Sequence, residues 1–182
     1  TKQLMVIDGQ FQTIKLTLPE SKVTLSKEDA ERAKTEAEKL NAIWQLKTNK
    51  AYVGSFIIPL NNDLSTGFGV KRVINNTSRH RGIDIRGKSG EPVAASNEGK
   101  VVLAEELFYG GNTVILDHGL GIYSVYMHLS EFNVKTGETV SKGNVIGYVG
   151  STGRSTGPHL HFGMKIGTMS INPLSLIQLK LF

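Results

Sequence analysis

Between residues 54 and 173 the sequence is built from short β-type runs that glycine-rich turns separate. No stretch of helical period lies between the runs, so the whole segment favours strands. The seven clearest runs cover residues 55–58, 92–95, 100–104, 112–116, 123–128, 144–149 and 159–164. The 20 glycines of the 182-residue chain fit many tight turns between short strands. We therefore predict a mainly β protein in which residues 54–182 form one domain around an antiparallel β-sheet.

Residues 1–25 contain two alternating runs, Gln3–Ile7 and Phe11–Leu18, with an Asp-Gly turn between them. A period of two around Asp-Gly predicts a β-hairpin. Because an isolated hairpin is marginally stable in water, we expect it to be an edge attached to the main domain or the remnant of a β domain that lies upstream.

Residues 26–53 contain the one clear helical pattern of the chain. Ser26 is a suitable N-cap, Asp29 lies at the capping-box position, and Glu28 and Arg32 are spaced for an i, i+4 ion pair. The apolar positions at helical spacing are Ala30, Ala33, Ala37, Leu40 and Trp44. We predict an amphipathic helix and linker that pack on the main domain and have no catalytic role.

Composition limits the chemistry that this chain can perform. The absence of cysteine leaves only nitrogen and oxygen ligands for a metal ion. The net charge of +5 is compatible with nucleic acid, an anionic membrane or an acidic polymer as partner, and it selects none of them. No apolar run approaches the roughly 18 residues of a membrane span, and no signal peptide is visible. Because the chain begins at Thr1 without a methionine, we expect a trimmed product whose targeting segment is missing.

Two histidines, His159 and His161, follow a Gly-Pro turn and begin an apolar run. If that run is a strand, both side chains point to the same face. The spacing fits a metal site, an acid–base site or a satisfied structural pair, and does not choose among them.

His80 and Asp84 are four residues apart, which in a straight strand is about 13 Å at roughly 3.3 Å per residue. That is too far for two ligands of one ion, but Gly82 between them allows the chain to bend. Alone, the pair favours a surface histidine beside a turn aspartate. Together with the histidine pair near residue 160, it fits a site of two histidines, one aspartate and a water molecule.

The remaining histidines carry weaker signals. His128 is expected to share a strand face with Tyr126 and Ser124, which is more often packing than catalysis. His118 enters a glycine-rich turn and is interpreted as a turn residue. The glycine-rich stretch 149–157 lacks the lysine of a phosphate-binding loop, so we interpret it as the rim of a cleft.

An ordered set of motifs resembles the lysostaphin-type, or LytM, zinc metallopeptidases that cut peptidoglycan. The resemblance covers residues 54–174. Its motifs are Phe68-Gly69, His80-Arg81-Gly82-Ile83-Asp84, Pro92-Val93-Ala94-Ala95, Gly99-Lys100-Val101-Val102, Gly111-Asn112-Thr113-Val114, Tyr126-Met127-His128-Leu129, Val140 with Gly143 and Ile146-Gly147, and Gly150-Ser151-Thr152-Gly153 through Gly157-Pro158-His159-Leu160-His161-Phe162.

The resemblance implies that His80, Asp84 and His161 bind zinc. It also implies that His128 and His159 are the two active-site histidines that do not bind the metal. One of them would act as general base on a metal-activated water, and the other would stabilise the oxyanion or protonate the departing amine. None of these positions is substituted, which argues against the inactive relatives.

We therefore predict a zinc-dependent endopeptidase that hydrolyses cross-links or stem peptides of bacterial peptidoglycan and works outside the cytoplasm. The alternative is a non-catalytic module of the same fold that binds the cell wall or activates an amidase. A nucleic-acid-binding β-barrel ranks far behind, because the basic residues are scattered without interleaved aromatics. Four arginines, Arg79, Arg81, Arg86 and Arg154, are candidates to meet substrate carboxylates, although a solvated role is the simpler interpretation.

Overall fold

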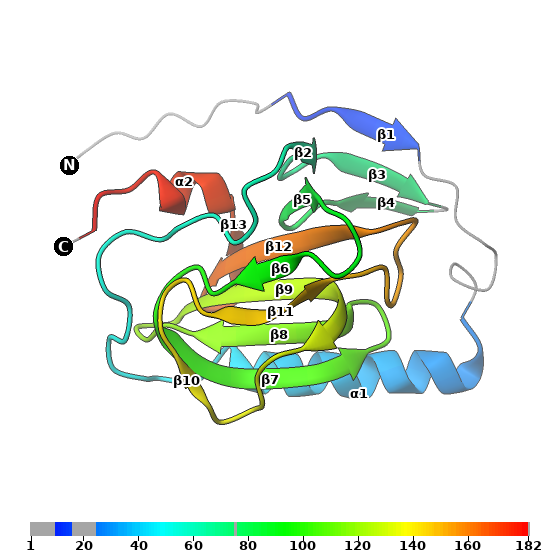
Figure 1. Ribbon diagram of the computed structural model, residues 1–182. Helices are drawn as coiled ribbons and strands as arrows, with labels where there is room; N and C mark the ends of the chain where they lie inside the picture. Colours follow the sequence, from blue (N-terminus) through cyan, green and yellow to red (C-terminus); the bar gives the residue numbers. More distant parts are fainter. Residues whose placement is uncertain (1–9, 16–24, 75, 182) are drawn as a thin grey trace, which may run out of the picture.

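A ten-stranded antiparallel sheet forms the body of the protein (Figure 1). The computed structural model describes residues 10–15, 25–74 and 76–181. In chain order the elements are β1 Thr13–Lys15, α1 Lys27–Ile43, β2 Leu64–Thr66, β3 Lys71–Ile74, β4 Asn76–Arg79, β5 Ile83–Arg86, β6 Pro92–Ala94, β7 Gly99–Leu107, β8 Gly111–Asp117, β9 Ile122–Phe132, β10 Thr139–Val140, β11 Val145–Val149, β12 His159–Ile166, β13 Met169–Ile171 and α2 Pro173–Ile177. The predicted mainly β, antiparallel fold is confirmed.

The main path of the sheet runs β10-β7-β8-β9-β12-β5-β2. Three strands lie off this path: β11 pairs with β9 and with β6, and β13 pairs with β12. A smaller sheet, β1-β3-β4, lies next to its β2–β5 edge (Figure 1). Strand β12 therefore lies between β9 and β5, although these three strands are far apart in the sequence. This arrangement brings residues near 84, 127 and 161 into one row across the sheet.

The two faces of the central strands have different roles. Phe162 on β12 is opposite Ile83 and Tyr126, and all three are fully buried in the main hydrophobic core. His161, the preceding residue, is opposite Asp84 and Met127. Since directly opposed residues share a face and neighbours along a strand alternate, one face of the sheet builds the core and the other presents polar groups.

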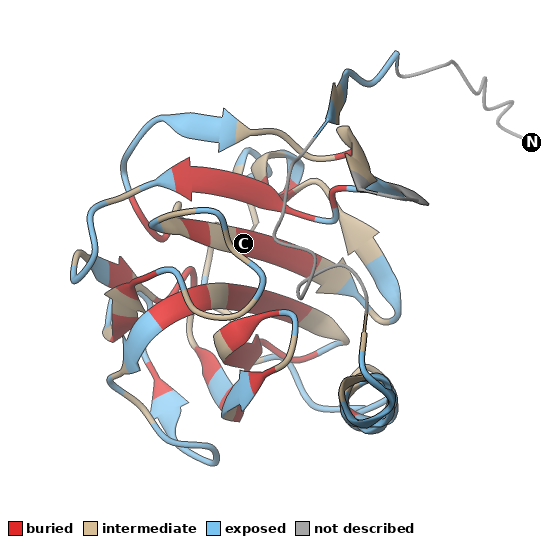
Figure 2. Ribbon diagram, turned by 90° about the vertical axis from the view of Figure 1, so that its right-hand side faces the viewer, coloured by how far each residue is buried: buried red, intermediate tan, exposed pale blue. Residues whose placement is uncertain are grey.

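Helix α1 begins as predicted, with the Asp29 N–H donating to Ser26 Oγ at 3.0 Å. The predicted partner of Arg32 is wrong, because Arg32 pairs with Glu36, 2.8 Å away, and not with Glu28. Apolar burial is concentrated in the last turn, where Ile43 is buried and Trp44 meets Tyr123 edge to face. The earlier turns are largely exposed (Figure 2) and contact the main domain through polar groups, since the Phe108 N–H donates to Glu36 and Lys39 pairs with Glu105.

Several local expectations need correction. Residues 55–58 do not form a strand; they are a loop that buries Phe56 in the core. The short helix α2 was not predicted. The first arm of the predicted hairpin lies outside the described residues, and its second arm contributes β1, which pairs in parallel with β3. None of the described helices has the length and apolar character needed to cross a membrane.

Candidate metal centre

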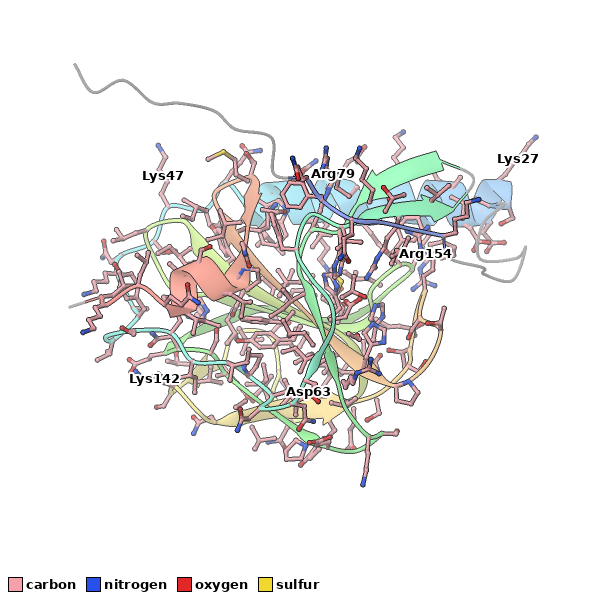
Figure 3. All side chains as sticks on the ribbon, turned by 90° about the horizontal axis from the view of Figure 1, so that it is seen from above. Lys27, Lys47, Asp63, Arg79, Lys142 and Arg154 are labelled. Atoms are coloured by element: carbon pink, nitrogen blue, oxygen red, sulfur yellow. The ribbon has the colours of Figure 1, made fainter. Side chains whose placement is uncertain are left out.

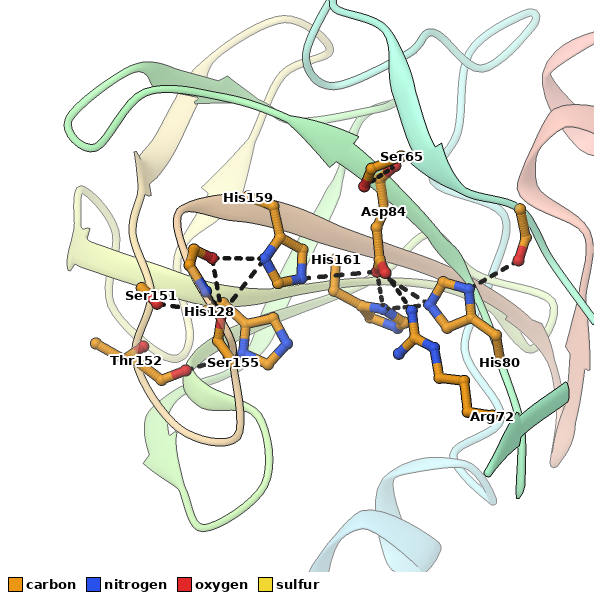
Figure 4. A network of polar contacts seen from close by, with 12 residues as sticks. Ser65, Arg72, His80, Asp84, His128, Ser151, Thr152, Ser155, His159 and His161 are labelled. Carbon is orange, nitrogen blue, oxygen red and sulfur yellow. Dashed lines mark hydrogen bonds and ion pairs between the residues drawn. The ribbon is translucent and has the colours of Figure 1, made fainter. Parts of the chain in front are cut away.

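Three side chains bring their donor atoms together on the polar face of the sheet (Figure 4). Nε2 of His80 lies 2.9 Å from Nδ1 of His161 and 3.0 Å from Oδ1 of Asp84. The third edge of this triangle, from His161 Nδ1 to Asp84 Oδ1, is 2.9 Å. All three residues are among those expected from the sequence to bind a metal.

Gly82 explains how two residues only four apart can converge. The chain bends at Gly82 between His80, which precedes β5, and Asp84, which is on it. A Cβ atom on residue 82 would lie 2.5 Å from the Phe162 carbonyl oxygen and 2.8 Å from His161 Nε2. The absence of a side chain at the bend thus allows the close approach of β12 and of the His161 ring.

The donor set fits zinc. The triangle edges of 2.9, 2.9 and 3.0 Å are close to the roughly 3.3 Å that separates neighbouring ligands about 2.0–2.1 Å from a tetrahedral ion. Nδ1 of His80 lies 2.8 Å from the Gly67 carbonyl oxygen, which favours the ring proton on Nδ1 and leaves the Nε2 lone pair for a metal.

The charge states of the donors agree with this fit. Burial alone would raise the pKa of Asp84, but hydrogen bonds with His161 and His80 outweigh it and hold that pKa well below its usual range. Burial lowers the pKa of His161, which favours the neutral imidazole. A carboxylate at Asp84 and a neutral ring at His161 are the forms that metal binding requires.

Arg72 on β3 contacts the second carboxylate oxygen of Asp84, so only Oδ1 faces the two histidines. Its Nε atom is buried and has no hydrogen-bond partner among the described residues. No spacing rule links Arg72 to Asp84, so the sequence alone does not single out this arginine. The contact depends on where the β3–β4 hairpin lies.

His128 and His159 lie beside the triangle with their ring centroids 4.8 Å apart. Nδ1 of His128 is 2.9 Å from the Thr152 carbonyl oxygen, and Nδ1 of His159 is 2.8 Å from that of Gly157. Nε2 of His159 lies 3.8 Å from Asp84 Oδ1. Burial, with the charges of His159 and His161, lowers the pKa of His128 to about 3. The two rings are thus anchored at one nitrogen each.

The predicted strand face of His128 is wrong. Tyr126 points into the core against Phe162, with ring centroids 5.3 Å apart, whereas His128 points to the cleft. His128 has a left-handed backbone (φ 66°), and the pairing of β8 with β9 shifts its register just before it. This bulge interrupts the alternation, so Met127 and His128 both face the polar side.

His118 is the one histidine that does not join the group. It lies between the end of β8 and the turn at residues 119–121, as predicted, and its side chain is fully buried. Its Nδ1 lies 2.7 Å from the Glu98 carbonyl oxygen and its Nε2 lies 2.7 Å from Ser124 Oγ. The chain of hydrogen bonds continues from Ser124 to Tyr126 and Ser96 within the core. Its role is structural.

The triangle of candidate ligands and the histidine pair line an open cleft of about 1500 Å³. The rim includes residues 154–158 of the glycine-rich stretch, in agreement with the predicted cleft rim. Two aromatic side chains, Phe11 and Tyr109, also line the cleft, and no sequence motif marks them.

Comparisons with a family model and with curated relatives point to the same family. The model of peptidase family M23 matches residues 78–173, more than half of the chain. A DD-carboxypeptidase/endopeptidase, Mpg, of Neisseria meningitidis is 40% identical over 110 residues, covering 60% of this chain and 25% of the relative. The glycyl-glycine endopeptidase ALE-1 of Staphylococcus capitis is 44% identical over 108 residues, covering 58% and 30%. The chain thus spans less than a third of the length of these relatives.

Solved structures agree. The structure of a putative peptidase M23 from Pseudomonas aeruginosa has a TM-score of 0.75 at 34% identity, covering 83% of this chain and 63% of that one. The catalytic domain of lysostaphin from Staphylococcus simulans has a TM-score of 0.62 at 37% identity, covering 65% and 94%. A zinc-containing peptidase from Vibrio cholerae has a TM-score of 0.65 at 28% identity, covering 72% and 41%.

Proposed function

Because the chain belongs to peptidase family M23, we propose that it is a zinc-dependent endopeptidase that hydrolyses cross-links or stem peptides of bacterial peptidoglycan. The observation that carries the proposal is the triangle of His80, Asp84 and His161, with two further histidines beside it in the same cleft. The names of the relatives, which include peptidoglycan DD-endopeptidases, support the substrate.

In this proposal His80 Nε2, Asp84 Oδ1 and His161 Nδ1 would hold a zinc ion. When bound, zinc supplies Lewis acidity and a water molecule of lowered pKa. Arg72 holds the other oxygen of Asp84, so the carboxylate offers a single oxygen to the ion. His80 is fixed from behind by the Gly67 carbonyl, which keeps its Nε2 directed at the site.

His128 and His159 move the protons of the reaction. The carbonyl oxygens of Thr152 and Gly157 favour the ring proton on Nδ1 in each case, which leaves Nε2 as the proton acceptor. One ring accepts the proton of the attacking water as general base. The other, once protonated, donates to the oxyanion or to the departing amine. The sequence-based roles of these five residues stay proposals.

The test is digestion of purified walls of defined chemistry, with and without chelator, followed by mass analysis of the released fragments. We expect chelator-sensitive release of fragments with new peptide termini. Fragments that carry a free sugar lactyl group would show amidase cleavage and contradict the endopeptidase proposal.

The alternative, a non-catalytic wall-binding or amidase-activating module, makes a different prediction. For the enzyme, His159→Ala abolishes wall lysis but keeps wall binding. For the module, binding survives every histidine substitution and the wild-type protein releases no fragments, with or without zinc.

Peptidoglycan lies outside the cytoplasmic membrane, so we place the activity in the periplasm, the cell envelope or the medium.

Within the chain we assign peptidase activity to residues 54–182 and a connecting role to residues 26–53. Deleting residues 1–50 tests whether the N-terminal part inhibits the cleft. Unchanged turnover would exclude inhibition and favour its interpretation as the end of an upstream domain.

A further inference from the structure

The cleft carries a strong imbalance of charge. Five arginines line it, and Asp84, whose carboxylate already contacts Arg72 and the two ligand histidines, is the one acidic side chain among the described residues that line it. The five are Arg72, Arg79, Arg81, Arg86 and Arg154. Whatever binds in this cleft meets a positive surface.

Two of these arginines are held by aromatic rings. The guanidinium of Arg79 lies over Phe11, 5.3 Å from the ring centroid, and that of Arg154 lies over Tyr109 at 4.5 Å. Both arginines are exposed (Figure 3). A guanidinium that stacks on an aromatic face keeps its N–H groups available at the edge. These two groups are therefore oriented while they remain able to bind a carboxylate.

Their places in the chain put them at different parts of the site. Arg79 ends β4 and directly precedes the ligand His80, whereas Arg154 lies in the loop that leads to His159. Figure 4 shows His80 at one end of the group of site residues and His159 with His128 at the other, with Asp84 and His161 between them. A peptide that crosses the centre would pass from one arginine toward the other.

Apart from Arg72, these arginines have no acidic partner among the residues that the structure describes. In the described part of the chain, no carboxylate lies within 4.0 Å of the guanidinium of Arg79, Arg81, Arg86 or Arg154. A further cation, Lys165, lies close enough to Arg81 to be affected by its charge. Burial and the charge of Arg81 lower the pKa of Lys165. Several unneutralised cations around one cleft favour an anionic ligand.

The relatives do not decide which bond is cut, because DD-endopeptidases and a glycyl-glycine endopeptidase match at similar identity, 39–40% and 44%. The two substrates differ in charge. A bridge made of glycine is neutral along its length, whereas peptide stems carry free carboxylates on their acidic residues. The charge of the cleft discriminates where sequence identity does not.

We propose that this cleft selects peptide stems with free carboxylates over neutral glycine bridges, with Arg79 and Arg154 as specificity-determining residues on the two sides of the metal centre. The inference rests on the proposed function, since it names the substrate class of that same site. Bidentate contact between guanidinium and carboxylate supplies the recognition.

The test is a binding measurement on the zinc-loaded protein, which does not require hydrolysis to succeed. The probes are a cross-linked stem fragment with free carboxylates, the same fragment after chemical amidation of the carboxylates, and a pentaglycine-bridged fragment. We expect amidation to raise the Kd at least about tenfold, as for the loss of one or two charge-assisted hydrogen bonds. Added salt should weaken binding of the free fragment and leave the amidated fragment almost unchanged.

Substitution of single arginines tests which side chains recognise the carboxylates. Arg79→Gln and Arg154→Gln should each raise the Kd of the free fragment about fivefold or more and leave that of the amidated fragment unchanged. Lys47→Gln removes the same charge from an exposed position outside the cleft (Figure 3) and is the matched control, with no expected change.

Equal Kd values for free and amidated fragments, tightest binding of the glycine-bridged fragment, or no measurable affinity for the free fragment would each overturn the inference. Failure of the proposed function gives a different result, in which the free fragment binds selectively but is not cleaved in the presence of zinc. Cleavage of the free fragment and the pentaglycine-bridged fragment at equal rates would support the endopeptidase proposal and contradict the proposed selectivity.

Discussion

His118 in the core and the histidines of the cleft differ in whether both ring nitrogens are bonded to the protein. In the core, both ring nitrogens of His118 bond to protein atoms, the Glu98 carbonyl and Ser124. At the other site, His128 and His159 are anchored at Nδ1 beside an open cleft. The same residue type thus forms a closed network in the core, whereas at the cleft it leaves one ring nitrogen of each histidine available for the proposed chemistry.

The two regions also differ in strain and polar satisfaction. Ser124, Tyr126 and Ser96 form a buried chain that supplies each hydroxyl with a partner. The cleft holds a left-handed His128 and an Arg72 Nε atom without a partner among the described residues. Such features cost stability and persist where the surrounding structure enforces them. We expect substitutions in the core group to change stability and substitutions in the cleft to change activity.

The largest effect should come from Asp84→Asn. The amide keeps the shape of the side chain but removes the one negative charge of the donor set, so zinc affinity should collapse. Wall hydrolysis should fall at least about a thousandfold, since metal-activated water would be lost. Zinc content by elemental analysis and fragment release measure the two effects. A variant that keeps stoichiometric zinc and full activity would show that Asp84 is not a zinc ligand.

His159→Ala and His128→Ala should separate chemistry from metal binding. Each should retain zinc while hydrolysis falls by about 10²- to 10⁴-fold, the usual contribution of a general acid or base. If either variant loses zinc as well, the division between ligand and non-ligand histidines is wrong. Nitrogens of both His159 and His161 at about 2.0–2.1 Å from one zinc ion would contradict it directly.

His118→Ala should show the opposite profile. It opens a cavity beside Phe56 and leaves Ser124 and the Glu98 carbonyl without their partner, so the free energy of unfolding should fall by about 2–4 kcal/mol. Activity per native molecule should stay unchanged. Urea unfolding followed beside the hydrolysis rate checks both. A stable but inactive variant would show that the core network reaches the cleft.

The smallest effect is the pH dependence of that difference. Burial lowers the pKa of His118 to about 4 from 6.5, so the native state holds the neutral ring. This contribution is fully present above pH 6.5. It is lost as pH falls toward 4, because the unfolded state takes up the proton first, and it amounts to about 3 kcal/mol in all. The stability gap between wild type and His118→Ala should therefore narrow from pH 7 to pH 4. A constant gap would contradict the lowered pKa.

The convergence of His80, Asp84 and His161 could be anticipated from the sequence better than the positions of His128 and Arg72. Alternation places His159 and His161 on one strand face, and the family motifs, which are local signals, single out the three residues as candidate ligands. The orientation of His128 depends on a bulge that forms only when β9 pairs with β8, and the contact of Arg72 depends on where a hairpin lies. The loop at residues 55–58 has the composition of a strand, but it fills the core with Phe56 and pairs with no strand. In each case the missing information is tertiary.

Gly82 has a consequence for mutational surveys of this protein. A survey that scores every substitution once for cellular abundance and once for wall lysis would separate position 118, which should fail mainly on abundance, from position 159, which should fail only on lysis. Position 82 should fail on both scores with any side chain, because the same missing Cβ admits the backbone of β12 and the ring of His161. Tolerance at that position cannot be recovered by stabilising the protein elsewhere, since added stability does not restore the space that the ring occupies.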